Sequence, residues 1–277
     1  LTINGRGIND GGALINSAGG TKTWPGTVAQ ATDSRIEISS GTTTITGAVS
    51  GAFNLIIGGA GNTTLSAATG TAGLSLTKQG AGTLTVTGTN THTGATRVEA
   101  GTLIYGATTT LAATQLTVLG GTYNMNATTD TIGTVTLIGG TISNGTLTAA
   151  TSYTLESGTI SAIIAGAIPV TKNTNNTVTL TGVNTISSTT TINAGTLTIS
   201  GSGSTVSVTA ITVNLGGTLT LDNSSTAVAS RLLDSLVLTM NGGNFNFIGN
   251  GAGASSETIG QLAIASGHSV VTVTPGA

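Results

Sequence analysis

The sequence predicts an all-β fold: a right-handed parallel β-helix (β-solenoid) with coils of about 20 residues. Three observations predict it. A Gly-Thr signal returns at a nearly constant interval along most of the 277 residues, and apolar and polar residues alternate after each signal. Charged residues make up only 6% of a chain that holds 43 glycines and abundant threonine. In a solenoid each strand pairs with its equivalents in the neighbouring coils, so like residues stack on like.

The Gly-Thr signal marks the start of each coil. The starts are Gly41, Gly61, Gly82, Gly101, Gly121, Gly140, Gly158, Asn176, Gly195, Gly217 and Gly243. Successive starts are 18 to 22 residues apart, except for a gap of 26 residues before Gly243. A coil of this length cannot bury its own apolar face, so a repeat of this period predicts stacked coils.

An alternating pattern after each start predicts a strand. Nine of the eleven residues two positions after a start are apolar, and so are ten of the eleven residues four positions after it. The exceptions are Thr43, Thr63 and Asn144. The residues between are mostly Thr, Asn or Ser, with Ile104 as an exception. Because the period is two, we expect the apolar residues to point inward and the threonines outward.

A second apolar pair often precedes the start, as in Leu116 and Val118 or Ile211 and Val213. Gly-Gly or Asn-Gly-Gly separates the two pairs and supplies the positive φ that a bend needs. One coil is therefore expected to hold two or three short strands. Charge is scarce, we infer, because stacked columns of like charge would repel one another.

Two segments fit the repeat less well. We expect residues 1–35 to form irregular N-terminal coils or a loop, and residues 36–277 to form the solenoid repeats. The first segment holds Trp24-Pro25 together with Arg6, Asp10, Lys22 and Arg35. The stretch 222–235, DNSSTAVASRLLDS, accounts for the longest gap, and we interpret it as a short helical or loop excursion.

Composition limits the classes of partner. Disorder is disfavoured because 38% of the residues are hydrophobic and Val, Ile and Thr abound. The net charge is −2 with single, scattered Lys and Arg, so we expect no nucleic acid partner. No apolar run approaches the ~20 residues of a membrane helix, so we expect no membrane insertion. There are no cysteines, and the chain starts at Leu1 without a signal peptide, which suggests processing or a longer parent chain.

Residues 78–103, KQGAGTLTVTGTNTHTGATRVEAGTL, closely resemble the passenger-associated repeat of bacterial autotransporters. The matching residues are Lys78, Gly80, Gly82, Thr83, Leu84, Gly88, Asn90, Thr93, Gly94, Thr96, Val98, Gly101, Thr102 and Leu103. His92 stands where the family usually has Tyr, and a degraded second copy runs from Lys172 to Leu197. Residues 231–277 also resemble tandem repeats of giant surface proteins of planctomycete-type bacteria. These resemblances imply a secreted β-helix exported to the surface of a Gram-negative-type bacterium.

No residue stands out as catalytic, cofactor-binding or metal-binding. His92 and His268 lie far apart without acidic or Cys neighbours, so we interpret them as turn residues. Polysaccharide-cleaving β-helices need carboxylates that converge on one face. Asp130, Glu156, Asp222, Asp234 and Glu257 fall on different coils, and only Asp222 and Asp234 are expected to approach each other, across the excursion. We therefore predict that the protein is not an enzyme and has no cofactor.

Aromatic residues and threonines offer two further interpretations. Four aromatic residues occupy inward positions and are expected in the core: Tyr105, Tyr123, Phe245 and Phe247. Trp24, outside the clear repeat, is the one aromatic that could contact a partner, although a role in anchoring a loop is the simpler interpretation. Outward Thr pairs resemble the grids of ice-binding solenoids, although they equally suit exposed strands. The pairs are Thr42/Thr44, Thr83/Thr85, Thr177/Thr179, Thr196/Thr198 and Thr218/Thr220, and Asn124, Ser143, Ser161 and Ile104 interrupt them.

The sequence thus favours a non-enzymatic, extracellular structural protein on the bacterial cell surface: a stiff rod that forms or belongs to a fibre. We expect self-association, end to end or lateral, or continuation in a longer parent chain. The alternative is an adhesin that displays a contact loop, 1–35 or 222–235, towards a surface or a glycan. An ice-binding threonine array is a third interpretation.

Overall fold

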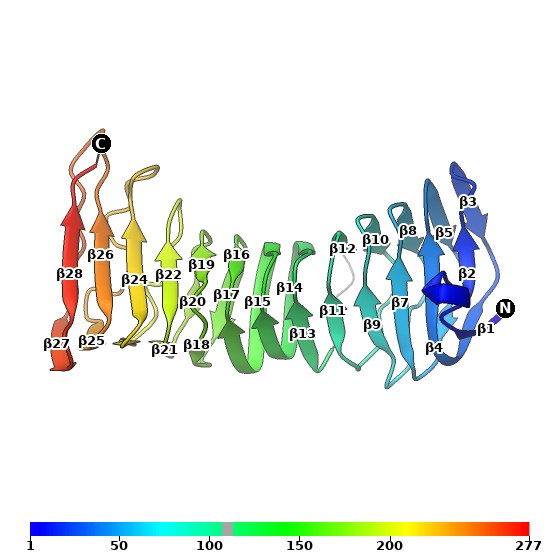
Figure 1. Ribbon diagram of the computed structural model, residues 1–277, viewed down its shortest axis with the longest axis horizontal. Coiled ribbons are helices and arrows are strands. Elements are labelled where there is room, and N and C mark those ends of the chain that lie inside the picture. Colours follow the sequence, from blue (N-terminus) through cyan, green and yellow to red (C-terminus); the bar gives the residue numbers. More distant parts are fainter. Residues whose placement is uncertain (107–112, 277) are drawn as a thin grey trace. The chain divides into compact units, whose positions relative to one another are not determined.

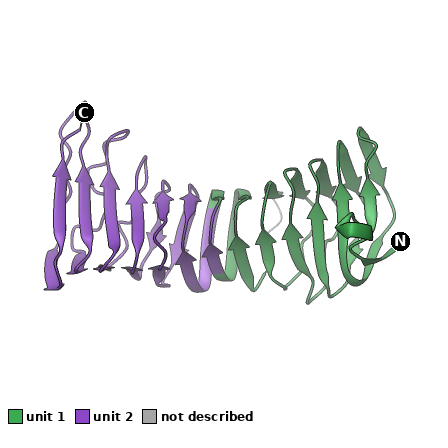
Figure 2. Cartoon of the chain, viewed as in Figure 1, with its two compact units in different colours: residues 1–134, 140–145 green, residues 135–139, 146–277 purple. Residues whose placement is uncertain are grey.

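A computed structural model describes residues 1–106 and 113–276 (Figure 1). These residues form a parallel β-solenoid of about 12 turns with coils of about 20 residues, which confirms the predicted fold class. Apart from one 3-10 turn, η1 (Ile8–Asp10), the regular elements of the described residues are strands. The chain divides into two compact units (Figure 2): unit 1 is Leu1–Thr134 with Gly140–Gly145, and unit 2 is Val135–Gly139 with Thr146–Ala277.

Parallel strands of unit 1 stack in three columns, here named A, B and C. Column A holds β3 (Thr21–Trp24), β5 (Thr42–Ile45), β8 (Asn62–Leu65), β10 (Thr83–Val86), β12 (Thr102–Tyr105) and the start of β14 (Thr122–Leu137). Column B holds β2 (Leu14–Asn16), the end of β4 (Val28–Ile38), β7 (Asn54–Gly58), β9 (Ser75–Lys78), β11 (Thr96–Val98) and β13 (Gln115–Val118). Column C holds β1 (Thr2–Gly5), the start of β4 and β6 (Val49–Ser50), and single bridges at Thr69 and Asn90 extend it.

Unit 2 has the equivalent three columns. Column A holds β16 (Gly158–Ile160), β19 (Thr177–Leu180), β22 (Gly195–Ile199), β24 (Gly217–Asp222), β26 (Asn244–Ile248) and β28 (Val270–Thr274). Column B holds the end of β15 (Thr141–Leu155), β18 (Val170–Lys172), β21 (Thr189–Ile192), β23 (Ala210–Asn214), β25 (Val237–Asn241) and β27 (Gln261–Ser266). Column C holds the middle of β15, β17 (Ile163–Gly166) and β20 (Thr185–Ile186).

The predicted inward positions form the core. Every residue two positions after a start is buried, including the polar Thr43 and Thr63. Four positions after a start, only Asn144 and Phe247 are not fully buried. Asn144 departs because the chain turns there: its φ is 55° and that of Gly145 is 145°, so its side chain leaves the core and donates to Asn124 Oδ1 at 3.3 Å.

Glycine at a coil start allows neighbouring coils to approach closely. Gly101 has φ 66°, and a Cβ added to it would lie 2.3 Å from the backbone oxygen of Gly82 in the adjacent coil. Gly195 has the same φ and would meet Asn176 O at 2.3 Å. These two starts therefore need glycine both for a left-handed backbone and for a close approach of backbone to backbone, whereas Gly82, whose Cβ would lie 1.8 Å from Gly61 O, needs it for the close approach.

The two segments that depart from the repeat have definite structures. In residues 1–35, strands β1, β2 and β3 pair in parallel with β4 and β5. Between β24 and β25, the described residues form turns rather than a helix. Leu232 and Leu236 of this second segment are fully buried, and Leu232 forms a bridge with Thr205.

Candidate functional site: corner ladders and buried cations

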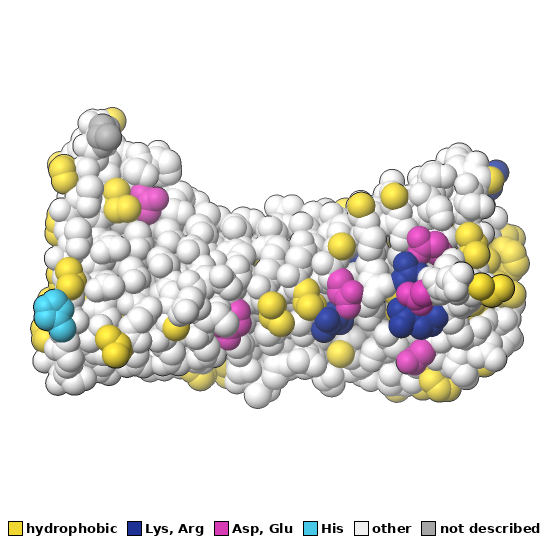
Figure 3. Space-filling view, viewed as in Figure 1, with side chains coloured by type: hydrophobic (Ala, Val, Ile, Leu, Met, Phe, Trp, Pro, Cys, Tyr) yellow, Lys and Arg dark blue, Asp and Glu magenta, His cyan; other side chains and the backbone are white. Residues whose placement is uncertain are grey.

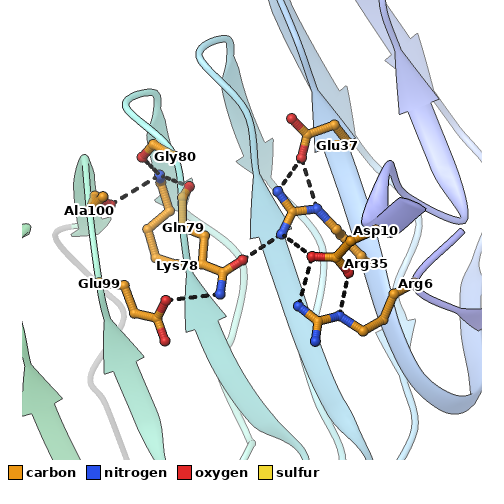
Figure 4. Close-up of polar contacts among 9 residues, drawn as sticks. All are labelled: Arg6, Asp10, Arg35, Glu37, Lys78, Gln79, Gly80, Glu99 and Ala100. Carbon is orange, nitrogen blue, oxygen red and sulfur yellow. Dashed lines mark hydrogen bonds and ion pairs between the residues drawn. The ribbon is translucent and has the colours of Figure 1, made fainter. Parts of the chain in front are cut away.

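Charged side chains on one face of the molecule gather over the first coils of unit 1 (Figure 3). A network of side-chain contacts, here named the polar ladder, joins most of them (Figure 4). Its members are Arg6, Asp10, Arg35, Glu37, Gln79, Glu99 and Arg97. Sequence reasoning missed this network, because its members lie up to four coils apart along the chain.

Arg35 lies at the centre of the polar ladder. Its guanidinium pairs with Glu37 Oε2 at 2.5 Å and lies 3.7 Å from Asp10 Oδ2, and it also donates a hydrogen bond to Gln79 Oε1. Glu37 and Gln79 are separated by one coil, in which Gly58 pairs with Glu37. A Cβ on Gly58 would lie 2.2 Å from Arg35 Nη2, so the glycine leaves room for Arg35 to reach over it.

Gln79 carries the ladder to the next coil. Its amide donates to Glu99 Oε2 at 2.9 Å, and Arg97 Nε pairs with Glu99 Oε1 at 2.5 Å. Partial burial opposes ionisation of Glu99, but the hydrogen bonds from Arg97 and Gln79 hold its pKa below the usual value. The three arginines of the polar ladder match its three carboxylates in number, so the charges of the network neutralise one another within the protein.

Glu37, Gly58, Gln79 and Glu99 share one place in their coils, the residue at the column B corner. Unit 2 fills this corner position with an asparagine ladder. The ladder consists of Asn173, Asn193, Asn214 and Asn241. The side-chain amides of the last three each donate a hydrogen bond to Oδ1 of the preceding asparagine, at 2.7, 2.7 and 2.9 Å. Its first member donates to Glu156 Oε1 at 3.1 Å. Both units therefore use the same corner to bond coil to coil through side chains.

Glu156 closes the asparagine ladder. Its carboxylate accepts backbone hydrogen bonds from Asn173 at 3.0 Å and Thr174 at 2.8 Å. Burial opposes ionisation, yet these hydrogen bonds lower the pKa of Glu156. This carboxylate orders a turn in the next coil, and it lies among backbone donors rather than beside a second acid.

Two lysines of the repeat motif point into the solenoid. The Lys78 ammonium donates to the backbone oxygens of Gln79 at 2.5 Å, Gly80 at 2.7 Å and Ala100 at 3.3 Å, the last from the following coil (Figure 4). Burial lowers the pKa of Lys78 to about 8, although Glu37 opposes this shift. Lys172 is equally buried and donates to Glu156 O at 3.1 Å and Thr174 O at 2.6 Å. Each lysine thus bonds turn carbonyls from two coils.

Arg231 is the largest fully buried side chain. Its guanidinium donates to the backbone oxygens of Gly201, Gly203, Asp222 and Thr226 and to Asn223 Oδ1, at 2.5 to 3.0 Å. The backbone N–H groups of Arg231 and Leu232 donate to Glu257, whose pKa is raised chiefly by burial. The 222–235 segment is therefore fastened to the coil before it by Arg231 and to the coil after it by Glu257.

His92 is a buried turn residue. Its Nε2 contacts Thr96 Oγ1 at 2.9 Å and its Nδ1 contacts Asn90 Oδ1. A Cβ on Gly70, in the adjacent coil, would lie 2.6 Å from His92 Cβ and 2.9 Å from its backbone N, so the chain at His92 passes too close for any residue but glycine at position 70. Burial lowers the pKa of His92 to about 4, and the ring is neutral at physiological pH. His268 is exposed on the last described coil.

The remaining acids named from the sequence lie in separate surroundings. Asp130 is buried and accepts a hydrogen bond from the Tyr123 hydroxyl at 2.5 Å, and burial together with Asp130 raises the pKa of Tyr123. Asp222 accepts from the backbone of Ser224 at 2.9 Å, and Asp234 from Ser230 Oγ at 3.1 Å. Within residues 1–106 and 113–276, no group of three His, Cys, Asp or Glu side chains is placed to hold a metal ion.

Tyr105, Tyr123 and Phe245 lie in the core, as their inward positions predict, and the two tyrosine rings pack edge to face at 6.1 Å. Trp24 is half-buried at the first coil. The outward threonines stack in register: Thr23, Thr44, Thr64 and Thr85 are successive partners in column A of unit 1. Ile104 and then Asn124 continue this row, so the threonine row ends at β12.

The comparisons with known proteins agree with this geometry. A model of the passenger-associated-transport-repeat matches the chain twice, at residues 76–104 and 170–199. The matches cover both buried lysines, and they confirm the resemblance seen around residues 78–103 and 172–197. No curated protein and no solved structure is significantly similar to the chain. In the described part of the molecule, no helix has the length and hydropathy of a membrane span.

Proposed function

We propose that this chain, a β-solenoid with two autotransporter passenger-type repeats, is a non-enzymatic structural stalk on the bacterial cell surface and part of a fibre. One observation carries the proposal. The polar side chains of the repeats bond one coil to the next: Lys78 and Lys172 bind turn carbonyls, and Gln79 bridges two coils of the polar ladder. Side chains committed to such bonds resist sliding of the coils, which is what a load-bearing rod requires.

Export is supported by the transport repeats and by the absence of cysteine from the sequence. A chain without thiols needs no oxidation step after it crosses a membrane, because backbone ladders already hold its coils together. The adhesin alternative has weaker support, since Arg231 and Glu257 fasten the 222–235 segment to the solenoid.

Surface exposure is testable with single cysteines, because the natural chain has none. Thr85→Cys, on the outward row, is expected to react with a membrane-impermeant maleimide on intact cells. The matched variant Val86→Cys, one residue away and fully buried, is expected to react only after denaturation. Labelling of Thr85→Cys only in lysed cells would contradict export.

The mechanical role is testable by pulling single molecules from both ends. The double substitution Lys78→Met and Lys172→Met is expected to lower the unfolding force while maleimide labelling on cells stays unchanged. Lys22→Met, which changes an exposed lysine, serves as the control and is expected to keep the natural force. An unfolding force that does not depend on the buried lysines would contradict the load-bearing role.

A further inference from the structure

The asparagine ladder of unit 2 has a direction. Asn193 Nδ2 donates to Asn173 Oδ1 at 2.7 Å, and Asn214 and Asn241 each donate in the same sense to the asparagine one coil before. An asparagine side chain carries an oxygen on one side and an NH2 group on the other, so a member that donates towards one end of the row accepts from the other end. The four side chains therefore form one head-to-tail row along the corner.

Glu156 fixes this direction at the acceptor end of the row. An ionised carboxylate only accepts hydrogen bonds, so Asn173 turns its NH2 group towards Glu156 and donates to Oε1 at 3.1 Å. The oxygen of Asn173 then faces the next coil, where a donor must satisfy it. The same requirement passes from member to member as far as Asn241, which lies three coils and roughly 14 Å beyond Asn173.

The second carboxylate oxygen of Glu156 is committed to the backbone. Oε2 accepts from the backbone N–H groups of Asn173 at 3.0 Å and Thr174 at 2.8 Å. When acid neutralises Glu156, a proton adds to one of its two oxygens and turns that oxygen into a donor. The two backbone N–H groups still need the other oxygen as their acceptor, so the new O–H group faces Asn173. Asn173 must then turn its Oδ1 towards Glu156 to accept from it.

A reversal of Asn173 does not stop at one coil. A reversed member beside an unreversed one places two NH2 groups, or two oxygens, against each other. A polar network that is only partly satisfied costs more than either complete arrangement. The row therefore has two complete states, one for each direction, and it changes between them as a unit.

We propose that the asparagine ladder is a two-state element: the negative charge of Glu156 holds it in its present direction, and the row reverses as far as Asn241 when acid neutralises that charge. This device goes beyond the proposed function and does not depend on it. Burial opposes ionisation, but the hydrogen bonds from Asn173 and Thr174 hold the pKa of Glu156 below its usual value. The present direction is therefore stable at neutral pH and is lost only as the pH falls below about 4.

The charged surroundings of Glu156 are simple. In the coil before, Leu137 O accepts from the backbone N–H of Glu156 at 2.7 Å, and the corner residues 137–139 are uncharged. In the coil after, the corner residues 172–176 include one titratable side chain, Lys172, whose Nζ donates to Glu156 O at 3.1 Å. Lys172 stays protonated in acid, so Glu156 is the group at this corner whose charge changes.

Nuclear magnetic resonance of isotope-labelled asparagine side chains tests the device in the folded chain. Glu156→Gln reproduces the neutral state at neutral pH, because it replaces one acceptor oxygen with an NH2 donor. Glu99→Gln, which neutralises a corner carboxylate of unit 1, is the matched control. Asn193→Ala interrupts the row between Asn173 and Asn214. Circular dichroism and thermal melting check that each variant is folded.

We expect Glu156→Gln to shift the Nδ2 signals of Asn193, Asn214 and Asn241 together, and Glu99→Gln to leave them unchanged. A merely structural role of Glu156 would disturb its neighbours in the adjacent coil and leave Asn241 as it is. A folded Glu156→Gln variant in which the signal of Asn241 does not move would overturn the device.

Acid titration of the natural chain gives a second readout, which does not require a variant at Glu156 to fold. The Nδ2 signals of the row are expected to move with one common midpoint, below the ordinary pKa of glutamate. After Asn193→Ala, acid should still move the signal of Asn173 and should no longer move that of Asn241. Separate midpoints along the row, or a response of Asn241 that survives Asn193→Ala, would overturn the device.

Discussion

The Arg35 guanidinium donates a hydrogen bond to Gln79 across an intervening coil, directly over Gly58. The contact joins residues 44 positions apart in the sequence. It exists because Gly58 has no side chain: an added Cβ would meet Arg35 Nη2 at 2.2 Å and Glu37 Oε2 at 2.5 Å. Space at one coil therefore permits bonding between the two coils beside it.

Gly58→Ala is expected to lower the free energy of unfolding by about 1–2 kcal/mol, since it displaces a partly buried, charged hydrogen bond. In an Arg35→Ala background the same change should cost less, because the guanidinium is absent and the Glu37 carboxylate, which it no longer holds, can rotate away from the added Cβ. A double-mutant cycle by urea unfolding measures the coupling. Gly82→Ala is the contrast, since its Cβ would meet Gly61 O at 1.8 Å and no side-chain deletion relieves that clash. Additive costs for Gly58 and Arg35 would contradict the bridge.

Removing a motif lysine should leave turn carbonyls without a donor. Lys78→Met or Lys172→Met is expected to cost about 2–3 kcal/mol, because each ammonium serves carbonyls of two coils. Urea unfolding of each variant measures the cost, with Lys22→Met as the exposed control. A loss of stability no larger than that of Lys22→Met would show that the carbonyls find other partners.

Lys78 should also make stability depend on alkaline pH. Its pKa is about 8 in the folded protein against 10.5 for a free lysine, so between these values the unfolded chain binds more protons. The free energy of unfolding is therefore expected to rise from pH 8 to pH 10.5. Urea unfolding across this range should show a shallower rise for Lys78→Met, and an equal rise in both proteins would contradict the shift.

His92 should affect stability on the acidic side. The folded pKa of about 4 lies below the ordinary 6.5, so the unfolded chain binds more protons between these values and stability falls as pH drops from 6.5 towards 4. His92→Gln, which keeps hydrogen-bonding capacity without titrating, is expected to flatten this part of the profile. Thermal melting from pH 4 to pH 7 measures both proteins, and parallel profiles would exclude His92 as the cause.

Arg231 tests whether the 222–235 segment is held in place. Arg231→Lys keeps the charge but cannot reach five acceptors with one ammonium, so a loss of about 3 kcal/mol or more is expected. Limited proteolysis should then cut first between Asn223 and Ser230. Arg97→Lys, at an exposed member of the polar ladder, is the control and should leave the cleavage pattern unchanged.

The inward columns could be predicted because one strand contains all the information they need. Leu84 and Val86 are inward because apolar and polar residues alternate around them, and the structure buries both. Asn144 is polar at a position where the alternation predicts an inward apolar residue. In the structure this residue lies at a bend with left-handed backbone geometry, so its side chain is not in the core. Lys78 matched a motif, but its burial was not foreseen, because alternation alone does not show where a long side chain finds acceptors.

The sequence by itself determined the strand, its two faces and the length of the coil, since these follow from local periodicity and from glycine at the bends. Only the tertiary structure decided which corner residues meet. Stacking brings residues about 20 positions apart to within ~4.8 Å of one another, and a shift of one residue would separate Asn193 from Asn173 and Gln79 from Glu99. The ladders depend on that register, and register is a property of packed coils rather than of any single repeat.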